Sequence, residues 1–223
     1  MKKLYIIILS LLVSSTVVAQ DNVPATASDK KPMSFQILAG SQGFGANFRY
    51  VPHKTIGIRV GGSFGKGSIN DKIEIEDFSS KNKLTGEITT IHALAELNPM
   101  GFVRFAVGAA YLAKAKADLF LQPKESQTVG EVTLTPDEIG ELNYHIDWGK
   151  AAPYVGIGLG RGIPKNKFNV NLDLGTYFLQ SPKVTAFGTK LLSDNESSAA
   201  KIQENMKSYR FLPVAQINFN FRF

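Results

Sequence analysis

The sequence contains no cysteine. This absence excludes a disulfide framework and also a lipid-modified N-terminal cysteine. Histidine is scarce as well: His53, His92 and His145 are the only three, and no two have the spacing of metal ligands. Lysine and arginine residues are scattered singly, so no basic run indicates a nucleic-acid partner. The composition therefore predicts a protein without a metal, a cofactor or bound nucleic acid.

Long apolar runs are absent beyond the N-terminus. The first residues, MKKLYIIILSLLVSSTVVAQ, combine two lysines, an apolar run from Leu4, and small residues before a cleavage position between Ala19 and Gln20. These are the three regions of a secretory signal peptide; the alternative, an uncleaved anchor, has an apolar run that is short for a spanning helix. Cleavage removes Lys2 and Lys3 and lowers the formal net charge from +6 to +4. We predict a signal peptide at 1–19, a polar lead-in at 20–32 and one domain at 33–223.

Apolar and polar residues alternate along the rest of the chain. In the last segment, QINFNFRF, Ile217, Phe219, Phe221 and Phe223 share one face of a strand, and polar residues share the other. A strand of a soluble sandwich can show this pattern, but soluble domains usually end in a polar tail. A strand between lipid and a polar lumen shows it too. The same alternation recurs in segments 43–50, 55–64, 89–97, 102–111, 154–162 and 168–178.

Connection lengths alternate between short and long. Segments 51–55, 98–101 and 163–167 are short and turn-like, whereas 65–84, 121–143 and 189–208 are long and polar. Outer-membrane barrels have short periplasmic turns, long external loops and an even number of strands. An even number requires a tight reversal at Gly40–Gly43 that splits 33–50 into two strands; the alternative is one long bent strand. The sequence thus predicts an all-β, eight-stranded antiparallel transmembrane β-barrel with short periplasmic turns and long external loops.

One long loop has the pattern of a helix. Ser193 and Glu196 have capping-box spacing, and Ala199, Ile202 and Met206 can share one helical face. We expect a short external helix in this segment.

The two faces of the strands predict two environments. Polar side chains point into the lumen, and apolar side chains face outer-membrane lipid. Phe223 closes the apolar face of the last strand and is the expected signal for the barrel-assembly machinery. The predicted lumen residues are Asn47, Arg49, Arg59, His92, Glu96, Arg104, Asp173, Asn218, Asn220 and Arg222, and the predicted lipid-facing residues are Phe48, Ile58, Phe105, Ile157, Leu172 and Phe219.

The polar residues predict ion pairs rather than catalysis. In a lumen with several arginines, Glu96 and Asp173 are expected to form salt bridges. Pairing of Leu97 with Val103 would place Glu96 directly opposite Arg104; the alternative is that both charges reach water independently. A lipid-modifying enzyme would need a histidine and a serine that meet on one wall of the barrel. The sequence identifies no serine as a partner of His145, the one histidine at roughly the right height. We therefore predict no catalytic residues.

A file of glycines lies in the segment GIGLGRG. Gly156, Gly158, Gly160 and Gly162 repeat at every second residue, which does not match a nucleotide-binding fingerprint that opens a helix. The repeat indicates a strand with a bare inner face, past which other lumen groups lie close to the backbone.

The order of several motifs resembles a family of small bacterial outer-membrane barrels. These motifs are GFGANFRY, IRVGG, AELNPMG, VGAAYLAKAKADL, AAPYVGIGLG, DLGTYFLQSPKV and FLPVAQINFNFRF. The chain is similar over nearly its whole mature length to CarO-type channels. That resemblance implies an eight-stranded barrel associated with uptake of small basic amino acids and with carbapenem susceptibility.

Two functions follow from this prediction. The first is a narrow porin-like channel for passive passage of small polar solutes across the outer membrane of a Gram-negative bacterium. Its interior would be barely wide enough for its own side chains. The second is a non-transporting barrel that acts through its external loops in adhesion, surface protection or envelope integrity. A closed salt-bridged plug would favour the second function, and a continuous water path the first.

Overall fold

The computed structural model describes residues 33–53, 55–71, 80–193 and 196–223. The predicted signal peptide and polar lead-in therefore lie outside the described residues. Among the described residues, no helix is long and apolar enough to span a membrane.

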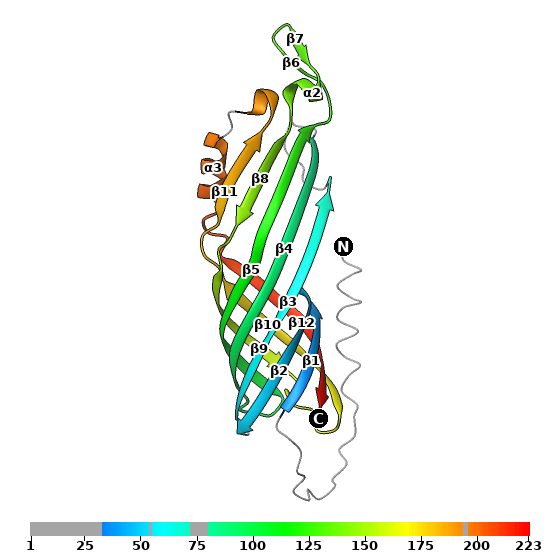
Figure 1. The fold of residues 1–223 in the computed structure, drawn as a ribbon, viewed down its shortest axis with the longest axis vertical. Helices are drawn as coiled ribbons and strands as arrows, with labels where there is room; N and C mark the ends of the chain where they lie inside the picture. Colours follow the sequence, from blue (N-terminus) through cyan, green and yellow to red (C-terminus); the bar gives the residue numbers. More distant parts are fainter. Residues whose placement is uncertain (1–32, 54, 72–79, 194–195) are drawn as a thin grey trace, which may run out of the picture. The chain divides into compact units, whose positions relative to one another are not determined.

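Eight strands form a closed antiparallel ring (Figure 1). Each strand pairs with its neighbour in the ring, and the ring closes because β12 pairs with β1 and β9 pairs with the first half of β5. This arrangement confirms the predicted all-β, eight-stranded antiparallel barrel. The ring strands are β1 (Met33–Gly40), β2 (Gly43–His53), β3 (Ile56–Asn70), β4 (Ser80–Leu97), β5 (Val103–Pro123), β9 (Ala151–Leu159), β10 (Phe168–Phe178) and β12 (Phe211–Arg222).

The reversal between β1 and β2 lies at the predicted glycines. Gly40 pairs with Gly43 across a two-residue connection, and Gly43 has a left-handed φ of 85° that favours glycine. The prediction of two strands in 33–50 is confirmed, and the alternative of one bent strand is wrong.

Beyond the ring, three strands continue at one end, which we call the extended end, and form there an extension of the same sheet, the extended sheet. There β3, β4 and β5 are joined by β8 (Leu142–Asp147) and β11 (Lys183–Gly188), in the order β11-β8-β5-β4-β3. The expectation that 65–84 is a loop is wrong, because β3 runs to Asn70 and β4 starts at Ser80. Glycine, lysine and threonine on these strands make them resemble a polar loop in sequence.

A β-bulge marks the transition from the ring to the extended sheet. Thr90 pairs with Leu112, whereas Thr89 pairs with Lys114, so Ala113 is an extra residue in β5. After the bulge, odd-numbered residues of β5, such as Ala115, face inward instead of even-numbered ones. This change of parity hides the continuation of β5 from an analysis of alternation.

Short elements complete the extended end. These are the hairpin β6 (Gln127–Val129) and β7 (Val132–Leu134), helix α2 (Pro136–Ile139), the 3-10 turn η1 (Lys190–Leu192) and helix α3 (Glu196–Met206). The predicted helix is confirmed as α3, and its external location remains a prediction. Its Ala199, Ile202 and Met206 pack against apolar residues of β8 and β11, including Tyr144 and Val184.

The hairpin between β4 and β5 differs from the predicted register. Leu97 pairs with Phe105, not with Val103, and Glu96 pairs with Ala106. The N–H of Asn98 donates to the carbonyl of Thr55 at 2.8 Å, which ties this link to the neighbouring link. The shift is two residues, so each side chain keeps its face. A period of two cannot distinguish the two registers.

Candidate functional site

The structure separates the predicted site residues by face. Nine of the ten predicted lumen residues have buried side chains, and Arg222 is half-buried and donates to the carbonyl of Pro164 at 3.0 Å. Of the predicted lipid-facing residues, Leu172 is half-buried and the other five are exposed on the outer face. Phe223 is also exposed, and its ring centroid lies 6.3 Å from that of Phe48. Contact with lipid and recognition of Phe223 remain predictions.

Five charged residues inside the ring form the ion-pair cluster: Arg49, Arg59, Glu96, Arg104 and Asp173. Each is 2% exposed or less. Arg49 donates to both oxygens of Glu96, from Nε to Oε2 at 2.7 Å and from Nη2 to Oε1 at 3.1 Å. Arg59 Nε lies 3.1 Å from Glu96 Oε1, and Arg59 Nη1 donates to Asp173 Oδ2. Arg104 Nη2 donates to Asp173 Oδ1. Each carboxylate thus bridges two guanidinium groups.

The cluster holds three guanidinium groups and two carboxylates, so it carries one excess positive charge. Backbone carbonyl oxygens lie beside this excess: Arg49 Nη1 donates to the carbonyl of Gly162 at 2.6 Å, and Arg104 Nη1 donates to that of Gly160. The glycines also make room, because a Cβ at Gly158 would collide with the guanidinium of Arg104 and the carboxylate of Asp173. The prediction that lumen groups pass close to a bare glycine face is confirmed.

Amide side chains surround the cluster. Gln216 Nε2 donates to Asp173 Oδ2 at 3.4 Å and to Asn218 Oδ1 at 2.9 Å, and Asn218 in turn donates to Asn171 Oδ1 at 2.7 Å. Across the ring, Asn47 donates to Gln36 Oε1 at 2.7 Å. These contacts link β1 to β2 and β12 to β10, so the side-chain hydrogen bonds inside the ring extend to two strands that carry no member of the cluster.

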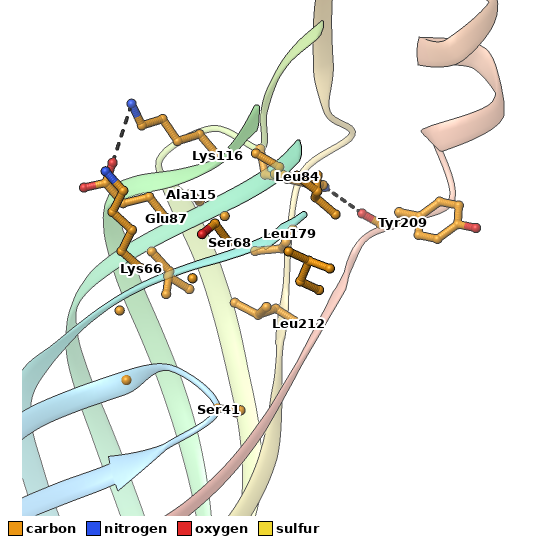
Figure 2. Close-up of a pocket in the computed structure, with 18 of the residues that line it drawn as sticks. Ser41, Lys66, Ser68, Leu84, Glu87, Ala115, Lys116, Leu179, Tyr209 and Leu212 are labelled. Atoms are coloured by element: carbon orange, nitrogen blue, oxygen red, sulfur yellow. Dashed lines mark hydrogen bonds and ion pairs between the residues drawn. The ribbon is translucent and has the colours of Figure 1, made fainter. Parts of the chain in front are cut away.

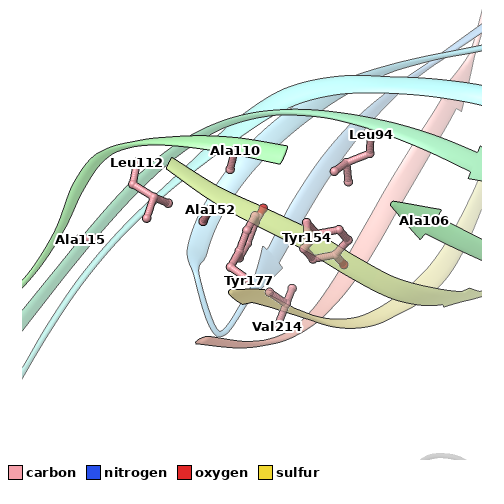
Figure 3. Packing of buried hydrophobic residues seen from close by; sticks show 9 residues of the cluster. All are labelled: Leu94, Ala106, Ala110, Leu112, Ala115, Ala152, Tyr154, Tyr177 and Val214. Carbon is pink, nitrogen blue, oxygen red and sulfur yellow. The ribbon is translucent and has the colours of Figure 1, made fainter. Parts of the chain in front are cut away.

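An apolar layer lies next to the cluster, toward the extended end. It consists of buried alanine, leucine, valine and tyrosine side chains of the ring strands (Figure 3). The rings of Tyr154 and Tyr177 meet with centroids 4.8 Å apart, and the Tyr177 hydroxyl lies 3.5 Å from Nδ1 of His92. Because the barrel encloses both a charged cluster and this apolar layer, its interior is a packed core. The members of the apolar layer are Leu94, Ala106, Ala110, Leu112, Ala115, Ala152, Tyr154, Tyr177 and Val214.

This apolar layer was not predicted from the sequence. Leu94, Tyr154 and Tyr177 occupy inward positions of strands whose outward positions are also apolar. Both faces are therefore apolar at these positions, and the alternation does not show which side chains point inward. Leu94 and Tyr177 lie an even number of residues from Glu96 and Asp173 on their strands, and Tyr154 lies an even number from Gly158. This spacing was the signal that could have identified them as inward-facing. Gln36 of β1 was also missed, whereas Asn171 and Gln216 are buried on the polar faces that the alternation predicted.

The predicted pair of Glu96 and Arg104 is wrong. Both side chains lie inside the ring, but Glu96 forms its ion pairs with Arg49 and Arg59, and Arg104 with Asp173. The wider β4–β5 hairpin moves Arg104 out of the position opposite Glu96. The partners come from β2, β3 and β10, which sequence alternation cannot bring together.

The histidines lie apart and contact different groups. His53 Nδ1 is 2.9 Å from the hydroxyl of Thr55, and His145 Nδ1 is 2.5 Å from Asp118 Oδ1. Within the described ranges, no three histidine, aspartate or glutamate residues are grouped so that they could hold a metal ion. Both buried carboxylates are held by guanidinium groups, so their ion pairs occupy the oxygens that acid–base chemistry would use.

A closed antiparallel ring with an apolar outer belt and a polar interior has the architecture of an outer-membrane β-barrel. The comparison with solved structures agrees. The chain is similar to CarO of Acinetobacter baumannii, with 22% identity and a TM-score of 0.61 over 86% of this chain and 98% of that protein. It is also similar to CarO2 of Acinetobacter baumannii, with 20% identity and a TM-score of 0.63 over 88% of this chain and 100% of that protein. These likenesses show a common fold.

No protein-family model matches the chain. No curated protein matches it either.

Proposed function

We propose that this protein is an integral outer-membrane barrel that is closed to solutes and acts at the cell surface through its extended end. The observation that carries the proposal is the ion-pair cluster, whose five members come from β2, β3, β4, β5 and β10. Strands on both sides of the ring are therefore joined across its interior.

Opening a path through this interior would be costly. A solute would have to separate buried guanidinium and carboxylate groups, and breaking a buried pair costs about 3–5 kcal/mol. It would then have to displace the tyrosines and leucines of the apolar layer. Eight-stranded barrels have interiors that side chains fill, and this one is filled by two successive layers. The narrow-channel hypothesis requires both layers to move together.

The extended end offers the larger surface for a role outside the membrane. Short turns lie on the periplasmic side of outer-membrane barrels, which assigns Thr55 and the links 98–102 and 160–167 to that side. The extended sheet, the β6–β7 hairpin and α3 then lie on the outer side. The proposal therefore assigns the function to the part of the chain that carries α3 and the exposed strands.

Electrical recording tests the closed state directly. The full mature chain is refolded into planar bilayers, and the same preparation is assayed for solute-dependent swelling of liposomes. We expect no steady conductance and no swelling with small amino acids. As a positive control, the variant Tyr154→Ala/Arg104→Ala, which removes bulk from both layers, should conduct. Steady single-channel steps from the unaltered protein would overturn the proposal and support the narrow channel.

A further inference from the structure

The wall of the ring has a notch at the extended end. The β1–β2 hairpin ends at Gly40–Gly43, whereas β3 continues to Asn70 on one side and β12 begins at Phe211 on the other. Pairing between β2 and β3 stops at Phe44 and Phe64, so the rest of β3 has no partner on that side among the described strands. The hairpin residues form the floor of the notch.

A cleft of about 690 Å³ opens at this notch, and we call it the rim cleft (Figure 2). Ile69, Leu84 and Ile88 line it from β3 and β4, and Trp148, Leu179 and Leu212 line it from the opposite side. The space is open, since a Cβ placed at Gly67 or Gly86 would meet nothing within 4 Å. Its volume lies within the range of small-molecule sites, which are mostly apolar clefts.

The rim cleft is the uncovered half of a larger apolar face. Ala117 and Leu119 of the extended sheet continue this face toward β8 and β11, where Ile202 and Met206 of α3 cover it. No element of the described residues covers the half on β3 and β4. An apolar face left open beside a covered one indicates a binding surface.

Lysines lie at the margin of the cleft. Lys66, Glu87 and Lys116 are directly paired across β3, β4 and β5 at the border of the cleft, and by alternation their side chains lie on the outward face of these strands, opposite to the apolar lining. Glu87 lies 2.6 Å from the Lys114 ammonium and 3.6 Å from that of Lys116. The hydrogen bond from Lys114 lowers the pKa of Glu87, so this carboxyl stays charged. One carboxylate facing three ammonium groups leaves the margin positive.

The notch lies where the outer surface changes character. Phe44 and Phe64 beside the hairpin are 65% and 63% exposed, and the next outward residue of β3 is Lys66. In membrane barrels, exposed aromatic residues mark the boundary between hydrocarbon and headgroups. The rim cleft therefore opens sideways at the level of the headgroups.

We infer that the rim cleft binds one acyl chain of an anionic, phosphate-bearing lipid of the outer leaflet. The acyl chain enters through the notch above Ser41 and lies against Ile69, Leu84 and Leu179 on the inward face, and the phosphate stays on the outward face of the sheet beside Lys66 and Lys116. This inference rests on the proposed membrane placement of the barrel but not on its closed interior. A conducting barrel could still bind the lipid.

Trp148 gives a direct readout, because it is the only tryptophan of the chain and it lines the cleft. The full mature chain is refolded in nonionic detergent, and phosphatidylglycerol with brominated acyl chains is added at low mole fraction. We expect saturable quenching of Trp148 fluorescence. Phosphatidylcholine with the same chains should need about tenfold more lipid, because each lysine near a lipid surface favours an anionic headgroup.

Two sets of variants distinguish binding of the acyl chain from binding of the headgroup. Gly86→Leu fills the cleft from a position with open space and should abolish the saturable quenching, with folding checked by heat-modifiable migration. Lys66→Gln/Lys116→Gln should quench equally with both lipids, whereas the matched control Lys167→Gln, at the short-turn end, should keep the preference. Equal quenching in the unaltered protein and in Gly86→Leu would overturn the inference. Quenching that appears only after residues 72–79 are replaced by a short glycine–serine link would assign the cleft to that segment instead.

Discussion

Glu96 and Asp173 show how buried charges are held at the scale of single residues. Each forms ion pairs with two guanidinium groups, so removing one carboxylate affects two arginines at once. Burial of charge without a partner is costly, whereas a fully partnered network is tolerated. The stability of the ring should therefore depend on the balance of positive and negative charges in the cluster as well as on each contact.

A double-mutant cycle on Arg49 and Glu96 tests this balance. Glu96→Gln leaves three guanidinium groups with one carboxylate and should cost about 3–5 kcal/mol in the free energy of unfolding. Arg49→Met should also destabilise, but the double variant restores the original net charge and should cost less than the sum. The measurement is urea unfolding in lipid vesicles. As a control, Glu204→Gln removes the exposed pair of Glu204 with Lys207 and should cost at most about 1 kcal/mol. Strict additivity of the Arg49 and Glu96 variants would contradict the coupling.

Gly158 gives a steric test of the same cluster. Its missing side chain leaves the space through which Arg104 reaches Asp173, so Gly158→Ala should displace that ion pair and lower stability. Gly86→Ala is the matched control, because its Cβ would meet no atom within 4 Å. The two variants are compared by urea unfolding, and equal stabilities would show that the cluster tolerates displacement.

At the scale of elements, the sequence predicted the ring well and the extended sheet poorly. The ring strands bury one face and expose the other, so their period of two is clear, and the glycines at 40 and 43 mark the first reversal. In the extended sheet glycines interrupt the apolar face of β3 and β4, and the bulge at Ala113 inverts the parity of β5. The β4–β5 link is hydrogen-bonded to the neighbouring link through Asn98, a contact that no local sequence pattern encodes.

Helix α3 was predictable because its apolar spacing is local. Its attachment to β8 and β11 depends on Ile202 and Met206, so Ile202→Asp should release the helix without unfolding the ring. We expect rapid proteolysis within 196–206 and unchanged heat-modifiable migration of the remainder. Lys201→Asp places the same side chain on an exposed position of the same helix and should leave the protease resistance unchanged. Loss of heat modifiability in Ile202→Asp would show that α3 supports the ring itself.

At the scale of the whole molecule, the outer surface decides whether the ring lies in lipid. Val107 and Leu97 are 58% and 55% exposed, and both point outward from adjacent strands. In water, arginine at either exposed position would change stability by at most about 0.5 kcal/mol. In a membrane the two positions differ by depth, because Val107 lies in the middle of the paired part of β5 and Leu97 lies at the last residue of β4.

We therefore expect Val107→Arg to cost about 2–4 kcal/mol and Leu97→Arg about 0–1 kcal/mol in the free energy of unfolding. The measurement is reversible urea unfolding in vesicles, followed by the fluorescence of Trp148 and by heat-modifiable migration. Val107→Leu, which keeps an apolar side chain, should behave as the unaltered protein and serves as the control for packing. Equal tolerance of arginine at both positions would mean that the apolar belt does not face hydrocarbon, and it would remove the basis for the membrane placement and for the lipid in the rim cleft.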